Sequence, residues 1–348
     1  MIGPALVAPD SFKGTFAATE VAAAIGRGLR ASGLDTVELP VADGGEGTLD
    51  ALLADLGGEL IETTVADPLE RDVAATFALL ERDPARAPGR GARRTADEPV
   101  AVVECARASG LGLVAEEERD AFAASTRGTG ELIAAAVEAG ARKVIVTVGG
   151  SATTDGGAGA VAALEEAGVR PKLEVWCDTR NPWEDAPRLF GPQKGADRET
   201  VRRLQRRLAR LAAKAPKDPR GVPLTGAAGG LSGGLWAWCG AQLVQGAPAV
   251  LDAVGFDDRM DEAALVVTGE GRLDRLTFQG KAVFEVATRA RQSGVACHAI
   301  VGGSTLDPFE ERILDLQTVA SAGTLAELES AGRALAETAL ASAAGAVR

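Results

Sequence analysis

Residues 264–274 read ALVVTGEGRLD, a short apolar run that passes directly into a loop of glycines and carboxylates. The same arrangement occurs in VELPVADGGEGT at residues 37–48 and in KVIVTVGGSATTDGGAG at residues 143–159. Glycine permits the positive φ angles and the close backbone approach that a bound phosphate requires. A carboxylate beside a phosphate would repel it unless a divalent cation lay between them. The three loops together therefore predict a site for a metal ion and a nucleotide.

Strand and helix patterns alternate at both ends of the chain. Candidate strands lie at 4–8, 37–41, 264–268 and 296–301, and candidate helices at 18–29, 49–56 and 282–291, before a helical tail to residue 348. Such alternation is typical of a parallel sheet covered by helices. We therefore predict an α/β fold in which residues 1–65 and 245–348 build one discontinuous domain.

Residues 66–244 form the predicted second domain, inserted into the first. Its expected elements lie at 74–80, 100–104, 131–139, 143–148, 157–167, 174–177 and 200–213. Residues 82–94 are rich in Pro, Gly and Arg, which indicates an exposed loop. The helix at 200–213 carries a ring of arginines, which we interpret as a solvated surface and not as a polyanion site.

Composition restricts the class of protein. A chain of 348 residues is long enough for two domains, and its net charge of -12 argues against nucleic acid or an anionic membrane surface as a partner. The start of the chain lacks the pattern of a signal peptide, and no apolar run reaches membrane-spanning length. Four widely spaced cysteines and a single histidine, His298, lead us to expect a cytoplasmic protein whose catalytic base is Asp or Glu.

Taken singly, the short motifs are weak. Gly280 and Lys281 lack the flanking residues of a Walker A loop, and residues 157–162 match only a loose dinucleotide pattern. Each glycine loop is also explained by turn geometry alone. At the carboxyl ends of parallel strands, however, such loops gather around one crevice, where ligands bind. Lys13 and Lys281 lie in tight turns from which an ammonium group can reach a phosphate.

A set of sequence blocks, in order between residues 4 and 304, resembles the bacterial glycerate kinase family, type 1. The blocks are PDSFKG (9–14), ADGGEGT (42–48), GTGELI (128–133), GGSA (149–152), DGGAG (155–159), FGPQKGA (190–196), GAAGGLSGG (226–234) and TGEGRLD (268–274). The resemblance implies a flavodoxin-like or Rossmann-like parallel-sheet domain enclosing an inserted α+β domain. It also implies phosphorylation of D-glycerate by ATP and Mg²⁺, most often giving 2-phosphoglycerate.

Within that resemblance, each candidate residue has an expected role. Lys13 and Lys281 are expected to hold the ATP phosphates, together with the loop glycines Gly44, Gly45, Gly47, Gly269 and Gly271. Glu270 and Asp274 are the expected magnesium ligands. Asp43 or Asp155 is expected to accept the proton of the glycerate hydroxyl, because no histidine is available. Ser151 and Arg127 are the expected ligands of the substrate carboxylate.

Some positions depart from the family pattern, and alternatives stay open. Thr154, Arg127 and Arg180 replace residues common in the family, and the segment 164–174 is shorter than usual. The two arginines favour a more anionic acceptor. Separately, a kinase that acts on the 3-hydroxyl, on another small hydroxy acid or on a sugar is one alternative, because it would share the nucleotide site. A non-catalytic nucleotide-binding regulator is another, although the loop carboxylates are all retained. A homo-oligomer is compatible with the sequence.

Overall fold

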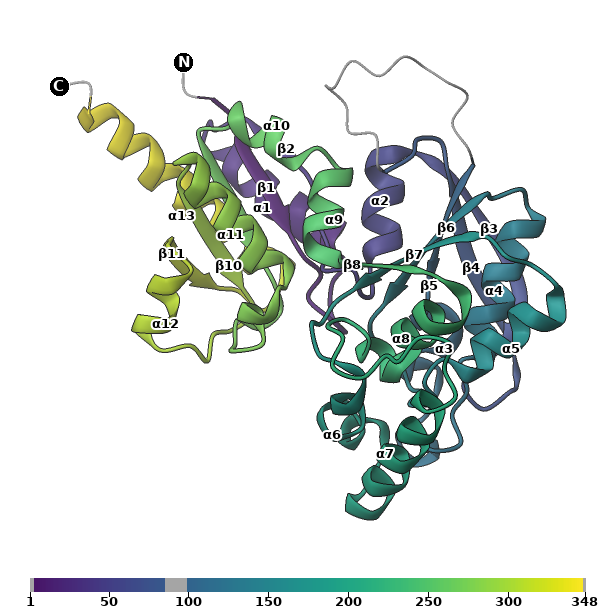
Figure 1. Cartoon of the computed structure of the whole chain (residues 1–348). Helices are drawn as coiled ribbons and strands as arrows, with labels where there is room; N and C mark the ends of the chain where they lie inside the picture. Colours follow the sequence, from purple (N-terminus) through teal and green to yellow (C-terminus); the bar gives the residue numbers. More distant parts are fainter. Residues whose placement is uncertain (1–2, 85–98, 347–348) are drawn as a thin grey trace. The chain divides into compact units, whose positions relative to one another are not determined.

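The computed structural model describes residues 3–84 and 99–346, which divide into two compact units (Figure 1). The described parts of the first unit are 3–43 and 250–346, and those of the second are 44–84 and 99–249. The predicted boundaries lay at 65/66 and 244/245. The structure instead places helix α2 (Thr48–Leu56) and strand β3 (Gly58–Ala66) in the second unit, because both contact its sheet. Most of the predicted loop at 82–94 lies outside the described residues.

The first unit is built on a fully parallel sheet in the order β11-β10-β9-β1-β2. Its strands are β1 (Ala5–Pro9), β2 (Thr36–Glu38), β9 (Leu265–Gly269), β10 (Cys297–Val301) and β11 (Leu316–Ser321). Every residue of β1 and β9 is buried. The sheet confirms the predicted α/β domain made from both chain ends. The prediction that only helix follows residue 304 was wrong in part, because strand β11 precedes the last helix.

Helices cover both faces of this sheet. Helices α1 (Ala18–Ala31) and α13 (Leu325–Ala346) share an apolar core with one face, which receives Ile300. Helix α11 (Ala282–Ser293) packs with the other face, which receives Ala299 and Val301. Shorter helices are α9 (Gly246–Ala253), α10 (Phe256–Asp261) and α12 (Pro308–Ile313).

Helices α1 and α13 approach each other unusually closely. A Cβ atom on Gly28 would lie 2.0 Å from the carbonyl oxygen of Glu329. A Cβ atom on Gly332 would lie 2.6 Å from the carbonyl oxygen of Ile25. Each helix therefore needs a glycine where the backbone of the other crosses it.

The second unit contains a mixed sheet in the order β3-β4-β5-β6-β7-β8, antiparallel from β3 to β5 and parallel from β5 to β8. The further strands are β4 (Asp72–Leu80), β5 (Val100–Glu104), β6 (Lys143–Val148), β7 (Lys172–Cys177) and β8 (Gln242–Gln245). Alternate residues of β6, beginning with Val144, join a core with α4 (Arg127–Glu138), α5 (Ala158–Ala167) and α8 (Ala227–Cys239). Helix α2 contacts β4 and β5, and α3 (Ala106–Ser109) contacts β3 and β4.

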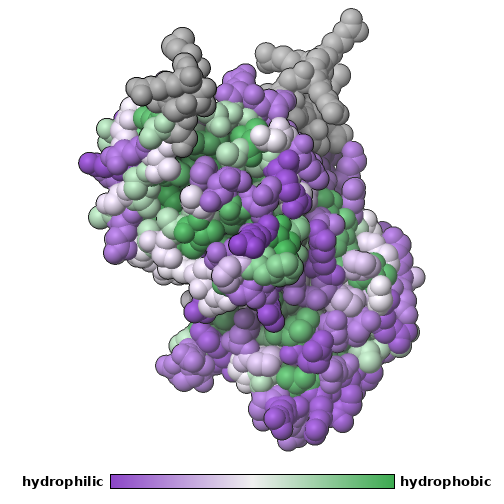
Figure 2. Space-filling view, turned by 90° about the vertical axis from the view of Figure 1, so that its left-hand side faces the viewer, coloured by the Kyte–Doolittle hydropathy of each residue, from purple (hydrophilic) through white to green (hydrophobic). Residues whose placement is uncertain are grey.

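Two further helices, the short α6 (Ala186–Phe190) and the longer α7 (Arg198–Ala212), complete the second unit, with short 3₁₀ turns between elements. The lowest part of the surface in Figure 2, at the height of α7 in Figure 1, is mostly hydrophilic. Arg203 and Arg207 of α7 lie over the Phe122 ring, with guanidinium carbons 4.1 and 5.4 Å from its centroid. Of the ring of arginines predicted to be solvated on this helix, these two therefore pack against an aromatic side chain of the protein. Among the described helices, none is both long and apolar enough to cross a membrane.

Candidate functional site

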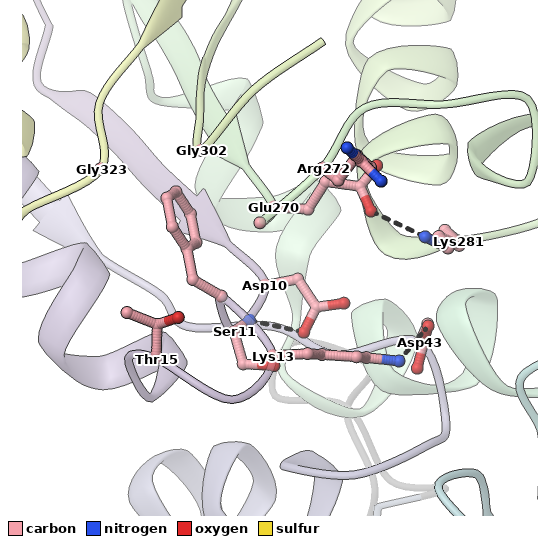
Figure 3. Close-up of a pocket in the computed structure, with 12 residues that line it drawn as sticks. Asp10, Ser11, Lys13, Thr15, Asp43, Glu270, Arg272, Lys281, Gly302 and Gly323 are labelled. Carbon is pink, nitrogen blue, oxygen red and sulfur yellow. Dashed lines mark hydrogen bonds and ion pairs between the residues drawn. The ribbon is translucent and has the colours of Figure 1, made fainter. Parts of the chain in front are cut away.

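A cavity of about 440 Å³ lies in the first unit at the carboxyl ends of its strands (Figure 3). Because all five strands are parallel, the loops that follow them meet at one edge of the sheet. Its lining comes from the loops after β1, β2, β9, β10 and β11, with the residue before α11, and comprises Asp10, Ser11, Phe12, Lys13, Thr15, Asp43, Glu270, Gly271, Arg272, Lys281, Gly302 and Gly323. The structure thus brings five predicted residues together: Lys13, Asp43, Glu270, Gly271 and Lys281.

Three carboxylates converge on this cavity. Asp10, Asp43 and Glu270 are 3%, 2% and 5% exposed. Burial, reinforced by the neighbouring Asp43, raises the pKa of Asp10 from 3.8 to about 8. Burial also raises the pKa of Glu270, although Lys281 opposes the shift. A cavity in which two buried carboxyls, Asp10 and Glu270, resist ionisation is a place where added positive charge is stabilised.

Positive groups lie on the same cavity. The Lys13 ammonium is 3.5 Å from Asp43 Oδ2, and the Lys281 ammonium is 3.1 Å from Glu270 Oε2. Lys281 immediately precedes α11, whose first backbone N–H groups are unpaired within the helix. The exposed Arg272 adds a guanidinium group. Lysine, arginine and a helix N-terminus at one cavity form a suitable environment for a polyphosphate.

The predicted metal ligands are only partly brought together. Glu270 borders the cavity, whereas Asp274 is not among its lining residues and accepts a hydrogen bond from the Leu276 N–H at 2.8 Å. Among the described residues, no three acidic, thiol or imidazole side chains are placed to bind one metal ion. Asp10 is the missed carboxylate of this site. Its position directly after a buried apolar run, in the PDSFKG block, was a signal for it.

The predicted residues Ser151 and Asp155 belong to the second unit, in the loop after β6. Asp155 is 1% exposed. One carboxylate oxygen accepts from the Thr126 N–H, the Thr126 hydroxyl and the Gly159 N–H at 2.9, 2.7 and 3.1 Å, and the other from the Gly157 N–H at 3.0 Å. The Asp155 carboxylate thus joins the starts of α4 and α5. These contacts favour a structural role over that of a base.

Ser151 contacts a buried lysine that sequence reasoning missed. The Lys194 ammonium donates to Ser151 Oγ at 2.8 Å and to the Thr153 carbonyl at 2.6 Å, and Lys194 is only 2% exposed. Burial lowers the pKa of Lys194 from 10.5 to about 8. Its place in the FGPQKGA block was the available signal. Arg127, by contrast, is 2.8 Å from Glu131 and 2.7 Å from Glu166, so its charge is already neutralised.

The predicted phosphate-binding glycines differ in surroundings. A Cβ atom on Gly44 would lie 2.5 Å from the Gly246 Cα, and one on Gly269 would lie 2.1 Å from the Ile300 carbonyl oxygen. The Gly47 N–H donates to the Glu104 carboxylate. Gly45 packs against Gly149, at which a Cβ atom would lie 2.6 Å from the Gly45 Cα. Close packing alone therefore explains most of these glycines, and only Gly271 lines the cavity.

The Glu104 carboxyl gives the second unit a testable pH dependence. It lies between the Gly47 N–H and Arg107, whose Nε is 3.1 Å from Glu104 Oε2, with Asp50 on the other side of Arg107. Burial raises the pKa of Glu104 from 4.5 to about 7. Because the pKa is raised in the folded state, the protonated Glu104 carboxyl contributes to the free energy of unfolding below pH 4.5. This contribution is lost as the pH rises through about 7.

We therefore expect the free energy of unfolding of the wild type to fall, relative to that of Glu104→Gln, between these two pH values. Urea denaturation at several pH values measures this difference. The exposed Glu59→Gln is the matched control. Parallel pH profiles for wild type and Glu104→Gln would contradict the buried carboxyl's role.

The first unit combines a flavodoxin-type sheet with a cavity that suits a polyphosphate and holds buried carboxylates. This combination is typical of the class of nucleotide-dependent phosphotransferases. A sequence profile of the glycerate kinase family matches residues 5–170 and 165–347. The chain therefore belongs to the glycerate kinase family, as the sequence blocks implied.

Individual relatives of the chain also belong to this family. The chain is 38% identical over 344 residues to glycerate kinase of Bacillus subtilis, covering 87% of this chain and 85% of the relative. It is 36% identical over 341 residues to glycerate 2-kinase of Escherichia coli, covering 87% and 86%. A crystal structure described as a candidate glycerate kinase 2 of Salmonella typhimurium LT2 aligns with a TM-score of 0.79 at 32% identity, covering 98% of this chain and 99% of that one. The protein is thus a kinase, and its family implies ATP as the phosphoryl donor.

Proposed function

We propose that this enzyme transfers the γ-phosphoryl group of ATP to the 2-hydroxyl of D-glycerate, giving 2-phosphoglycerate and ADP. The observation that carries the proposal is the cavity of the first unit, where three cations face three buried carboxylates. The choice of the 2-hydroxyl is supported by the similarity to the Escherichia coli glycerate 2-kinase.

The cations of the cavity bind the donor. Lys13, Arg272 and Lys281 contact the ATP phosphates, and the N-terminus of α11 adds backbone N–H donors. Phosphoryl transfer depends mainly on such positioning and charge neutralisation.

The cavity's carboxylates also fit Mg²⁺ in chemistry, because carboxylate oxygens are the hard donors that this ion prefers. Asp10 and Glu270 would hold the ion, with phosphate and water oxygens completing its shell, since protein side chains supply few ligands to such sites. When bound, Mg²⁺ neutralises charge on the transferring phosphoryl group. The metal role first predicted for Asp274 has no support from the cavity lining.

Asp43 serves as the base. The glycerate hydroxyl oxygen forms a bond to the γ-phosphorus while the bond from that phosphorus to the β,γ-bridging oxygen breaks, and ADP leaves. Asp43 accepts the hydroxyl proton. Of the two carboxylates proposed from the sequence, Asp43 borders the cavity, whereas Asp155 is enclosed by hydrogen-bond donors.

The proposal is tested by incubating the protein with ATP, Mg²⁺ and D-glycerate and identifying the product by phosphorus NMR. 2-Phosphoglycerate is the expected product. Formation of 3-phosphoglycerate would show that the 3-hydroxyl is the acceptor. A panel of small hydroxy acids and sugars distinguishes other acceptors. ATP binding by calorimetry without turnover on any acceptor would instead indicate a non-catalytic regulator.

The Lys281 side chain gives a specific prediction for the donor site. Lys281→Ala removes a charge-assisted contact to phosphate and should raise the KM for ATP by about 10- to 100-fold. The KM for D-glycerate should change little. Lys281→Arg, which keeps the charge, is the matched control in steady-state kinetics. An unchanged KM for ATP in Lys281→Ala would make Lys281 a purely structural partner of Glu270.

A further inference from the structure

The Glu270 carboxylate is held at both of its oxygens. The Thr277 hydroxyl donates to Oε1 at 2.7 Å, and the Lys281 ammonium donates to Oε2 at 3.1 Å, the bond drawn as a dashed line in Figure 3. Thr277 is 0% exposed and Glu270 is 5% exposed. Each carboxylate oxygen can accept from more than one partner. The carboxylate can therefore bind a cation from the cavity without losing either of these contacts.

The other hydrogen bond of the Thr277 hydroxyl fixes the direction of its proton. The Asp274 N–H donates to Thr277 Oγ1 at 3.1 Å. A backbone N–H can only donate, so Oγ1 accepts there, and its single proton is directed to Glu270. Thr277 thus presents a buried hydrogen-bond donor to the carboxylate. Donors of this kind restrain the orientation of carboxylates that bind metal ions.

The loop that carries Thr277 is closed by backbone hydrogen bonds of its own. The Thr277 N–H donates to the Asp274 carbonyl at 3.0 Å, and the Lys281 N–H donates to the Thr277 carbonyl at 3.3 Å. The Glu270 backbone is held separately, since its carbonyl accepts from the Gly302 N–H at 3.1 Å. The bond from the hydroxyl to the carboxylate is additional to these contacts. What it restrains is therefore the Glu270 side chain.

We propose that Thr277 is a positioning residue of the donor site that acts through Glu270. Its hydroxyl holds the Glu270 carboxylate in the orientation that binds the divalent cation accompanying ATP. Thr277 does not itself border the cavity, and it lies with Asp10, Glu270 and Lys281 in the first unit. The inference rests on the proposed function for the identity of the donor and adds a residue to its cation site.

The test is the binding of Mn²⁺, used in place of Mg²⁺, to Thr277→Val, which keeps the shape of the side chain and removes the hydroxyl. Mn²⁺ is titrated into the protein with and without saturating ADP, and the free ion is measured by electron paramagnetic resonance. The Kd for Mn²⁺ should rise by about 10- to 100-fold, the usual effect of losing such a partner. Thr277→Ser, which keeps the hydroxyl, should bind Mn²⁺ within a few-fold of the wild type. Thr338→Val, at an exposed threonine of α13, is the matched control.

A double variant separates an effect through Glu270 from an effect through the loop. Thr277→Val also removes the acceptor of the Asp274 N–H. In a Glu270→Ala background the carboxylate is absent, so Thr277→Val should weaken Mn²⁺ binding no further. A loss of the same size in both backgrounds would show that Thr277 acts through the loop and would overturn the inference. If Thr277→Val does not fold, Thr277→Ala, which removes the hydroxyl with less bulk, takes its place.

Steady-state kinetics supply a second measurement. In Thr277→Val the Mg²⁺ concentration that gives half the maximal rate should rise by a factor similar to that for Mn²⁺ binding. The KM for D-glycerate should stay unchanged, whereas a general loss of folded structure would lower kcat alone.

The proposed function is judged separately, by turnover of D-glycerate in the wild type. If the wild type phosphorylates no acceptor but Thr277→Val binds Mn²⁺ more weakly, the inference stands and the proposed function fails. Unchanged Mn²⁺ binding in Thr277→Val, or no Mn²⁺ binding by the wild type, overturns the inference.

Discussion

Asp43→Asn should lower kcat by at least about 100-fold, because a positioned general base contributes roughly 10²- to 10⁴-fold. The asparagine amide keeps the size of the side chain and cannot accept the hydroxyl proton at neutral pH. The Asp43 carboxylate is buried and lies 3.5 Å from the Lys13 ammonium, so the effect of the substitution on folding is measured beside its effect on kcat. The measurements are kcat with D-glycerate and the melting temperature.

The exposed Asp35→Asn, in the same unit, is the matched control and should retain normal kcat. If Asp43→Asn keeps kcat within a few-fold of the wild type, the proton is accepted elsewhere. A large loss accompanied by a much lower melting temperature would show that Asp43 acts through the fold.

Asp155→Asn should instead act on stability. The Asp155 carboxylate accepts four hydrogen bonds from residues 126, 157 and 159. An amide presents a single acceptor oxygen and turns an N–H donor toward other donors. Loss of about two hydrogen bonds to a buried charge should lower the free energy of unfolding by about 3–5 kcal/mol. Thermal denaturation should show a melting temperature lower by roughly 10 °C.

Activity per folded molecule should stay within a few-fold of the wild type in Asp155→Asn. Thr126→Val, which removes one of the four donors, is the graded control and should lose about 1 kcal/mol. A normal melting temperature combined with a 100-fold loss of kcat would transfer the role of base from Asp43 to Asp155.

The sequence predicted the central strands of the first unit because they are buried on both faces. Strand β1 is a continuous apolar run followed by Asp10, and β9, with the sequence LVVTG, ends at Gly269. The edge strand β11 gives no such pattern, since its residues LQTVAS are exposed or half-buried. The start of α8 is irregular in a way that residue spacing does not show. Its residues 228–230 have positive φ angles, and a Cβ atom on Gly229 would lie 2.0 Å from the Thr153 carbonyl oxygen.

The candidate site was predictable where residues lie in the loops that follow the parallel strands. Asp43, Glu270 and Lys281 reach the cavity because their loops lie at one edge of a parallel sheet. Residue spacing could not reveal Lys194, which reaches Ser151 from a short turn far along the chain. Nor could it show that Arg127 is neutralised, because Glu166, one of its two partners, comes from another helix. Contacts that depend on tertiary packing leave no periodic signal.

The close crossing of α1 and α13 has a consequence for biosynthesis. Helix α1 can pack on α13, and strand β1 can pair with β9 (Ala5 opposite Leu265), only after the residues between them have been synthesised. The second unit is nearly continuous in sequence and can fold while the chain is still growing. The first unit is therefore completed only after the whole second unit has been synthesised.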